Sequence, residues 1–207
     1  LIVDEAHNAR TALSFDTLAR FRPAAIIEFT ATPDTGDTSK TPSNVLHSVS
    51  AAELKAEDMI KLPIRLETKQ SWQDILADAI VQLQDLEKKS IIDRQNTGEY
   101  IRPIMLIQAQ PKRQGHETLT VETIRKALIE DYRIPEEQIA RATGEKDELE
   151  GINLRDEKCP IRYIITVYAL KEGWDCPFAY VLCSLTEMHK ASAVEQILGR
   201  ILRLPYS

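Results

Sequence analysis

Short, fully apolar runs alternate with amphipathic stretches along the chain, and this alternation limits the fold more than any other feature. Five runs have the length and composition of buried strands: Leu1–Val3, Ala25–Thr32, Ile104–Ile107, Ile161–Val167 and Tyr180–Leu185. Apolar spacings of three and four residues predict four main helices: Thr11–Arg20, Trp72–Ile91, Leu119–Tyr132 and Ala191–Leu202. A solvated turn is predicted after the second helix, at Asp93–Tyr100. Strands that alternate with helices favour an α/β fold with a parallel sheet.

Composition divides the chain into three segments. Residues 1–44 end in the stretch PDTGDTSKTPSN, whose Pro, Gly, Ser, Thr and Asp content is typical of a loop. Residues 45–70 contain a short predicted helix, Ala51–Met59, followed by the extended stretch KLPIRL. This middle segment is interpreted as a crossing between two lobes, and residues 71–207 supply the second lobe.

Composition also excludes several classes of protein. A net charge of −6 over 207 residues rules out a uniformly basic nucleic-acid coat, although a local basic groove needs only a few Lys and Arg side chains. No apolar run approaches the length of a membrane span, and the sequence shows no signal peptide. Three unevenly spaced Cys and four scattered His give no zinc or disulfide pattern, so we expect a reducing, cytoplasmic setting.

Two carboxylates, Asp4 and Glu5, directly follow the apolar run Leu1–Val3. A strand tip of this kind lies at the carboxyl edge of a parallel sheet, where the ligands of α/β folds bind. An Asp in that place can hold Mg²⁺ through the water shell of the ion, and an adjacent Glu can polarise an attacking water. On these residues alone, a strand followed by a solvated acidic turn is an equally good interpretation.

Four motifs follow one another along the chain: DEAH at Asp4–His7, TATP at Thr30–Pro33, TVYALKEGWDCP at Thr166–Pro177 and QILGRILR at Gln196–Arg203. In this order they resemble the motifs of superfamily 2 helicases of the DEAD/DEAH-box type. The EGWDCP wording, together with the stretch VSAAELKAEDMIKLPI, resembles the restriction-helicase branch, which includes the motor subunits of type III restriction enzymes. One departure is that the spacing from Thr166 to Gly173 is one residue longer than is usual in related helicases.

The resemblance covers essentially the whole chain and implies two RecA-like lobes, each a parallel sheet flanked by helices. Residues 1–44 would form the C-terminal part of the first lobe, and residues 71–207 most of the second. The implied activity is ATP hydrolysis with Mg²⁺, coupled to movement along DNA, which we expect to be double-stranded. A modification or specificity subunit and an attached endonuclease are further partners that the resemblance implies.

The resemblance also implies roles for individual residues. Asp4 would organise Mg²⁺ through water, Glu5 would activate the hydrolytic water, and two arginines would stabilise the transition state, Arg200 and Arg203. Nucleotide contacts or coupling between lobes would fall to His7, Thr30, Thr32, Gly173, Asp175, Gln196 and Gly199. Contacts to the nucleic-acid backbone would fall to Gln108, Lys112, Arg113 and Thr166. The alternatives are a solvated helix flank for the arginines and an ordinary solvated loop for the stretch QAQPKR.

None of the seven glycines lies in the Walker A pattern Gly-x-x-x-x-Gly-Lys-Ser/Thr, whose amides and Lys hold the phosphates of ATP. We therefore expect these residues to be a fragment of a motor that is inactive as an ATPase by itself. Two other functions stay open on the sequence. One is a non-catalytic remnant that binds nucleic acid or a partner, and the other is a helicase that acts on RNA.

Overall fold

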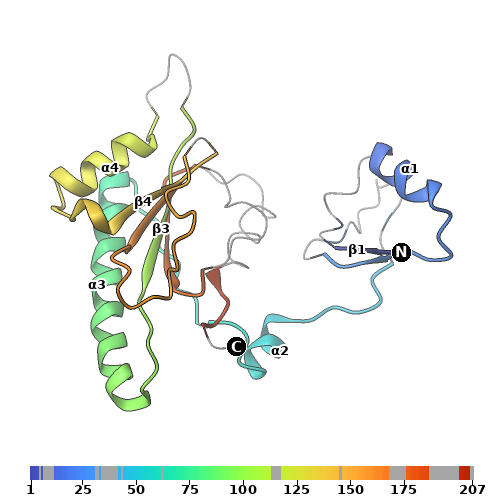
Figure 1. Ribbon diagram of the computed structural model, residues 1–207, viewed down its shortest axis with the longest axis horizontal. Helices are drawn as coiled ribbons and strands as arrows, with labels where there is room; N and C mark the ends of the chain where they lie inside the picture. Colours follow the sequence, from blue (N-terminus) through green and yellow to red (C-terminus); the bar gives the residue numbers. More distant parts are fainter. Residues whose placement is uncertain are drawn as a thin grey trace. The chain divides into compact units, whose positions relative to one another are not determined.

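The computed structural model describes residues 1–4, 6, 12–30, 33, 42, 44–61, 63–112, 118–144, 146–167, 176–186 and 201–205 (Figure 1). The chain divides into two compact units, residues 1–50 and residues 51–207, and each is described by itself. Both units contain parallel strands accompanied by helices. The predicted α/β class, with parallel sheets flanked by helices, is therefore confirmed.

The first unit contains a strand–helix–strand motif: β1 (Ile2–Val3), α1 (Ala12–Arg20) and β2 (Ile27–Glu28). The two strands are parallel, and β2 is shorter than the predicted strand Ala25–Thr32. Leu1 is 46% exposed and Ile2 is 68% exposed, so the prediction that this run is buried on both faces is wrong for the described residues. The physical reason is that the described part of this sheet has two strands, too few to cover both faces.

The second unit is built around a four-stranded parallel sheet of order β4–β5–β3–β6 (Figure 1). Its strands are β3 (Ile104–Gln108), β4 (Ile139–Ala142), β5 (Tyr163–Thr166) and β6 (Ala179–Ser184). β3 lies between β5 and β6, and all five of its residues are buried. Burial on both faces explains why this strand is an unbroken apolar run in the sequence.

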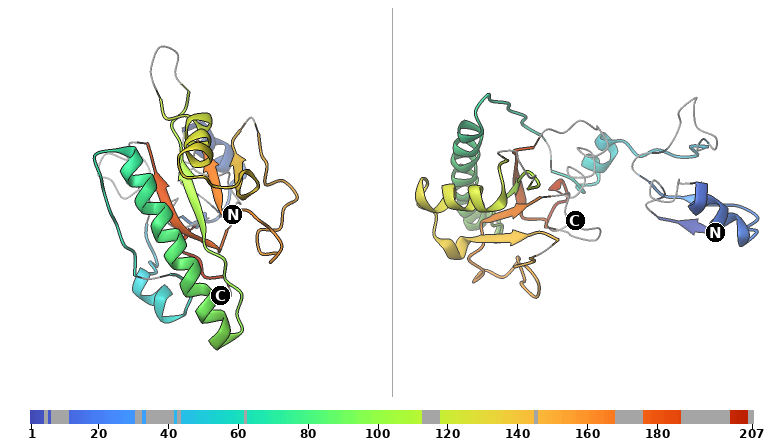
Figure 2. Two further views of the ribbon diagram at one scale, coloured as in Figure 1. Left: turned by 90° about the vertical axis from the view of Figure 1, so that its left-hand side faces the viewer. Right: turned by 90° about the horizontal axis from the view of Figure 1, so that it is seen from above.

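Two helices, α3 (Trp72–Thr97) and α4 (Val121–Glu130), pack on one face of this sheet (Figures 1 and 2). Leu83 of α3 and Ile124 of α4 belong to the same core cluster as Ile107 of β3. Ile104 belongs to a second cluster, which contains Phe178. Successive strand residues point to opposite faces, so β3 contributes to both clusters. None of the described helices is both long and apolar enough to cross a lipid bilayer.

The predicted turn at Asp93–Tyr100 is wrong for its first five residues, because α3 continues to Thr97. The prediction ended the helix where its apolar spacing ends, near Ile91. The last turns of α3 have no buried face, and Ile91 is 60% exposed, so periodicity could not detect them. The helix ends at Gly98, whose φ of +79° suits glycine and whose N–H donates to the carbonyl of Arg94 at 2.9 Å.

The segment expected to cross between lobes contains a short helix, α2 (Ala51–Ala56), which is shorter than the predicted Ala51–Met59. The structure groups this helix and the extended chain after it with the second unit, residues 51–207. The predicted helix Ala191–Leu202 lies outside the described residues, except for its last two residues.

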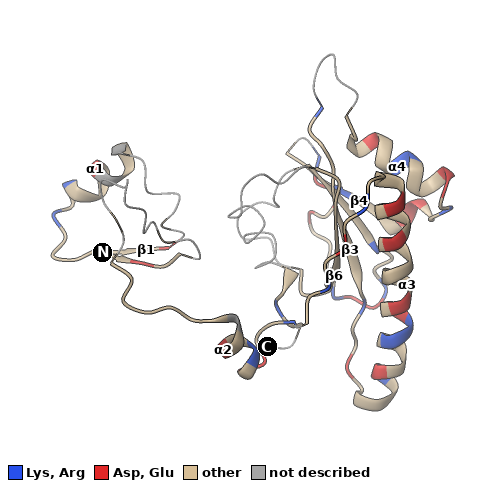
Figure 3. Cartoon of the chain, turned by 180° about the vertical axis from the view of Figure 1, so that it is seen from behind, with Lys and Arg blue, Asp and Glu red and all other residues tan. Residues whose placement is uncertain are grey.

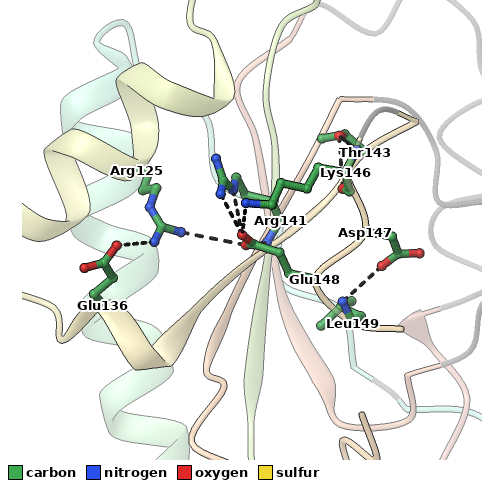
Figure 4. Close-up of polar contacts among 8 residues, drawn as sticks. All are labelled: Arg125, Glu136, Arg141, Thr143, Lys146, Asp147, Glu148 and Leu149. Atoms are coloured by element: carbon green, nitrogen blue, oxygen red, sulfur yellow. Dashed lines mark hydrogen bonds and ion pairs between the residues drawn. The ribbon is translucent and has the colours of Figure 1, made fainter. Parts of the chain in front are cut away.

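The edge strand β4 was not predicted. A 3₁₀ turn at Glu136–Gln138 precedes it, and a cluster of charged side chains surrounds its Arg141 (Figure 4). Arg141 of β4 donates to Glu148 Oε1 from Nη2 at 2.6 Å and from Nε at 3.1 Å. Lys146 Nζ lies 3.0 Å from the same oxygen, and Arg125 Nη1 lies 3.8 Å from Glu148 Oε2. The hydrogen bond from the Arg141 side chain is the main reason why the pKa of Glu148 falls from 4.5 to about 2.

A lowered pKa stabilises the fold at a pH above the unfolded value and ceases to do so as the pH falls through the folded value. We expect Glu148→Gln to lower the free energy of unfolding at pH 7 by up to roughly 3 kcal/mol. The deficit relative to the wild type should shrink between about pH 4.5 and pH 2. Urea unfolding at a series of pH values measures this difference in the free energy of unfolding. Glu150→Gln, which changes an exposed carboxylate, is the matched control. A deficit that stays constant down to pH 2 would contradict this assignment.

Candidate nucleotide and nucleic-acid site

The polar ends of three strands meet at the carboxyl edge of the four-stranded sheet. Gln108, Thr166 and Ser184 are the last residues of β3, β5 and β6. In the strand register, Gln108 is the partner of both Thr166 and Ser184. The structure thus brings together Gln108 and Thr166, two of the residues predicted to contact nucleic acid, at the edge where ligands of α/β sheets bind.

Ser184 was not predicted as a site residue, yet it orders this edge. Its hydroxyl donates to Gln108 Oε1 at 3.1 Å and lies 3.3 Å from the carbonyl of Thr186. The rule that selected Asp4, a polar residue directly after an apolar run, does not find Ser184, because the predicted strand Tyr180–Leu185 runs past it. Gln108 and Thr166 are only 8% and 4% exposed. Their burial favours a role in positioning the edge rather than one in forming its outer surface.

Gln110 closes the base of the loop that follows β3. Its backbone N–H donates to the carbonyl of Leu119 at 2.8 Å, and its side-chain Oε1 accepts from the N–H of Leu119 at 3.1 Å. Its Nε2 donates to the carbonyl of Leu185, just beyond β6, at 2.9 Å. These three bonds fix both ends of the loop against the carboxyl edge. The loop presents Lys112, which is exposed, as a cation at this edge.

Charge elsewhere on the second unit is mixed. All charged residues of α3 before Lys88 are acidic, and α4 carries both signs (Figure 3), so neither helix offers a continuous basic face. A phosphate backbone would therefore find a local rather than a general attraction. The exposed side chain of Lys112, placed beside the polar strand ends, is the described cation best placed to supply it.

In the first unit, Asp4 and Thr30 follow β1 and β2, so both lie beyond the carboxyl ends of parallel strands. The N–H of Phe29 donates to the carbonyl of Val3, and the N–H of Ala6 to the carbonyl of Phe29, which holds these two chain segments together. Asp4 is exposed and Thr30 is half-buried.

The remaining predicted site residues are placed unevenly. Arg203 lies in the second unit, with an exposed side chain and a backbone that forms an antiparallel bridge to Ile60. The others lie outside the described residues: Glu5, His7, Thr32, Arg113, Gly173, Asp175, Gln196, Gly199 and Arg200.

The carboxylates of the described residues decide where a metal ion could bind. Among the described residues, no group of three or more His, Cys, Asp or Glu could hold a metal ion by itself. A single exposed carboxylate such as Asp4 still fits Mg²⁺, which keeps most of its water ligands and is often held by one carboxylate together with the phosphates of the substrate.

No protein-family model matches the chain, and comparisons with curated proteins and with solved structures found no match either.

Proposed function

We propose that these residues form part of the motor of an ATP-dependent DNA helicase or translocase, of the kind found in type III restriction enzymes. Residues 1–44 would belong to the first of two RecA-like lobes, and residues 71–207 to the second. The order of the DEAH, TATP, TVYALKEGWDCP and QILGRILR motifs supports this assignment.

One structural observation carries the proposal. Gln108 and Thr166 end neighbouring parallel strands in register, and the family resemblance assigned both residues to nucleic-acid contact. These strands are far apart in the chain, and a different strand order would have separated them. Their meeting at the carboxyl edge, beside a loop that presents Lys112, supports a nucleic-acid site there.

The chemistry follows from the residue types. Mg²⁺, when bound, would neutralise charge on the phosphates of ATP. Asp4 would hold the water shell of the ion, and Glu5 would polarise the attacking water. Arg200 and Arg203 would stabilise the charge that spreads over the γ-phosphoryl oxygens in the transition state. The interpretation that the two arginines share one helical face is wrong for Arg203, because its backbone forms an antiparallel bridge to Ile60 instead of continuing a helix.

The test compares two polypeptides, the 207-residue chain and a longer protein that carries these residues behind a Walker A loop. The short chain should bind DNA in a salt-dependent manner and should not hydrolyse ATP, because its sequence contains no Walker A pattern. The longer protein should hydrolyse ATP, and double-stranded DNA should stimulate the rate.

A second function is passive binding of nucleic acid or of a partner, for which the exposed Lys112 beside the polar strand ends would suffice. Salt-dependent DNA binding by the longer protein without any ATP hydrolysis would support this alternative and contradict the motor. Stimulation by RNA that exceeds stimulation by DNA would instead identify an RNA-directed helicase, since RNA is distinguished by its 2′-hydroxyl groups.

A further inference from the structure

Residues 59–61, which follow α2, pair with residues 202–204 near the other end of the chain. Ile60 and Arg203 form an antiparallel bridge. The N–H of Lys61 donates to the carbonyl of Leu202 at 2.6 Å, and the N–H of Leu204 donates to the carbonyl of Met59 at 3.3 Å. Both neighbours of Arg203 are thus hydrogen-bonded to the same short segment.

The side chain of Lys61 strengthens this pairing. Its Nζ donates to the carbonyl of Ile201 at 2.7 Å and to the carbonyl of Ala179, the first residue of β6, at 2.8 Å. The same ammonium lies 4.1 Å from the centre of the Tyr180 ring, a distance at which a cation and an aromatic face attract each other. Lys61 therefore joins three segments: the extended chain after α2, the start of β6 and residues 201–204.

The extended chain beyond Lys61 is held less closely. Residues 63–67 line a cavity of about 380 Å³ that they share with α3 and β6. Ile64 is 42% exposed and Leu66 is 82% exposed, so this stretch gains little from apolar packing. At its far end Lys69 Nζ forms an ion pair with Asp78 of α3 at 2.8 Å, with both side chains nearly half exposed. The partly buried anchor at Lys61 is the stronger of the two, because exposed ion pairs contribute little.

We infer that Lys61 is a positioning residue that makes Arg203 move together with the segment between the two lobes. The inference rests on the proposed function, in which that segment changes position during the ATP cycle and Arg203 acts on the γ-phosphoryl group. Because the backbone on both sides of Arg203 is bonded to residues 59–61, a shift of that segment displaces the guanidinium. A displacement of about 1 Å can change a catalytic rate by about 10²-fold.

Amide hydrogen exchange on the 207-residue chain tests the anchor directly. We expect Lys61→Met to speed exchange at residue 61 and at Leu204 by roughly tenfold to a hundredfold, because two hydrogen bonds from a charged group are lost. Exchange at Ile107 in the core should not change. Lys61→Arg should restore protection, since its guanidinium can reach the same carbonyls. The matched control is Lys69→Met, which removes the same charge from the other end of the stretch and should leave Leu204 protected.

Two results would contradict the claim that Lys61 holds residues 202–204 in place. One is unchanged exchange at Leu204 in Lys61→Met, and another is equal acceleration in Lys69→Met. Should Lys61→Met also speed exchange at Ile107, the arginine variant decides: restored protection at Leu204 supports the anchor, and failure to restore it contradicts the anchor.

Kinetics test the positioning role in the longer protein with a Walker A loop. Lys61→Met should lower kcat for ATP hydrolysis by roughly 10- to 100-fold and leave KM within about twofold, because the guanidinium acts in the transition state. Lys61→Arg should recover much of the loss. An unchanged kcat would contradict the role of Lys61. A wild-type protein that never hydrolyses ATP would contradict the proposed function, and the exchange result would still decide whether Lys61 fixes residues 202–204.

Discussion

Replacement of Arg203 by lysine is expected to lower nucleic-acid-stimulated ATP hydrolysis by roughly 10³-fold or more in a protein that carries these residues behind a Walker A loop. Lysine keeps the positive charge but loses the planar fork of donors that can contact two phosphoryl oxygens at once. The loss should appear in kcat, because the charge that Arg203 would stabilise develops in the transition state. Steady-state hydrolysis at saturating ATP and DNA measures it.

The Arg203→Lys variant should change the guanidinium group without disturbing the fold. The side chain of Arg203 is exposed, and the bridge to Ile60 uses backbone atoms that lysine also has. Stability should therefore change by less than about 0.5 kcal/mol. The matched control, Arg155→Lys, changes another exposed arginine of the second unit and should hydrolyse ATP at the wild-type rate. Equal rates for Arg203→Lys and the control would remove Arg203 from the catalytic set.

The buried parts of the fold were the most predictable from sequence. β3 lies in the middle of its sheet, so both of its faces demand apolar side chains, and the run Ile104–Ile107 records this. The helix that became α4 shows three- and four-residue spacing because one of its sides is buried, at Ile124 and Leu128 for example. Burial on one side leaves a period in the sequence, and burial on both faces leaves an unbroken apolar run; both patterns can be recognised.

Elements without such burial were missed or cut short. The edge strand β4 has the sequence IARA, in which only Ile139 and Ala140 are buried. It is held by its parallel pairing with β5 and by the ion pair between Arg141 and Glu148. The end of α3 is exposed on all sides, so its length is set by Gly98 rather than by a buried stripe. In both cases the stabilising contacts join residues whose proximity follows only from the folded chain.

The residues of the candidate site also divide into those that the sequence could predict and those that it could not. The position of Gln108 could be predicted, because it directly follows the apolar run Ile104–Ile107. Thr166 lay inside the predicted strand Ile161–Val167, and the structure ends the strand at this residue.

The contributions of Gln110 and Lys61 could not be predicted. Their side chains bind backbone carbonyls of distant segments, and a carbonyl carries no sequence signal. Such residues are found only when the fold brings the carbonyls within reach.

Arg102 is a third residue of this kind, and its replacement should have the largest effect on stability. It is 3% exposed, and its guanidinium donates to the carbonyls of Asp156 at 3.0 Å, Leu154 at 2.5 Å and Cys159. Its loss would remove a charged donor that three carbonyls share in the loop that closes the second core cluster, to which Leu154 and Cys159 contribute. The carbonyl of Asp156 would keep the N–H of Cys159 as a donor, and that of Cys159 would keep Arg162 Nη1. We expect Arg102→Met to lower the free energy of unfolding by roughly 3–5 kcal/mol.

Urea unfolding followed by tryptophan fluorescence measures this loss in the second unit, because both tryptophans of the sequence, Trp72 and Trp174, fall within residues 51–207. Arg155→Met is the matched control, since it removes an exposed arginine from the same loop and should change stability by less than about 0.5 kcal/mol. Arg102→Lys should recover only part of the loss, because a single ammonium lacks the spread donors of the fork. A midpoint for Arg102→Met equal to that of the control would mean that solvent, rather than Arg102, satisfies these carbonyls.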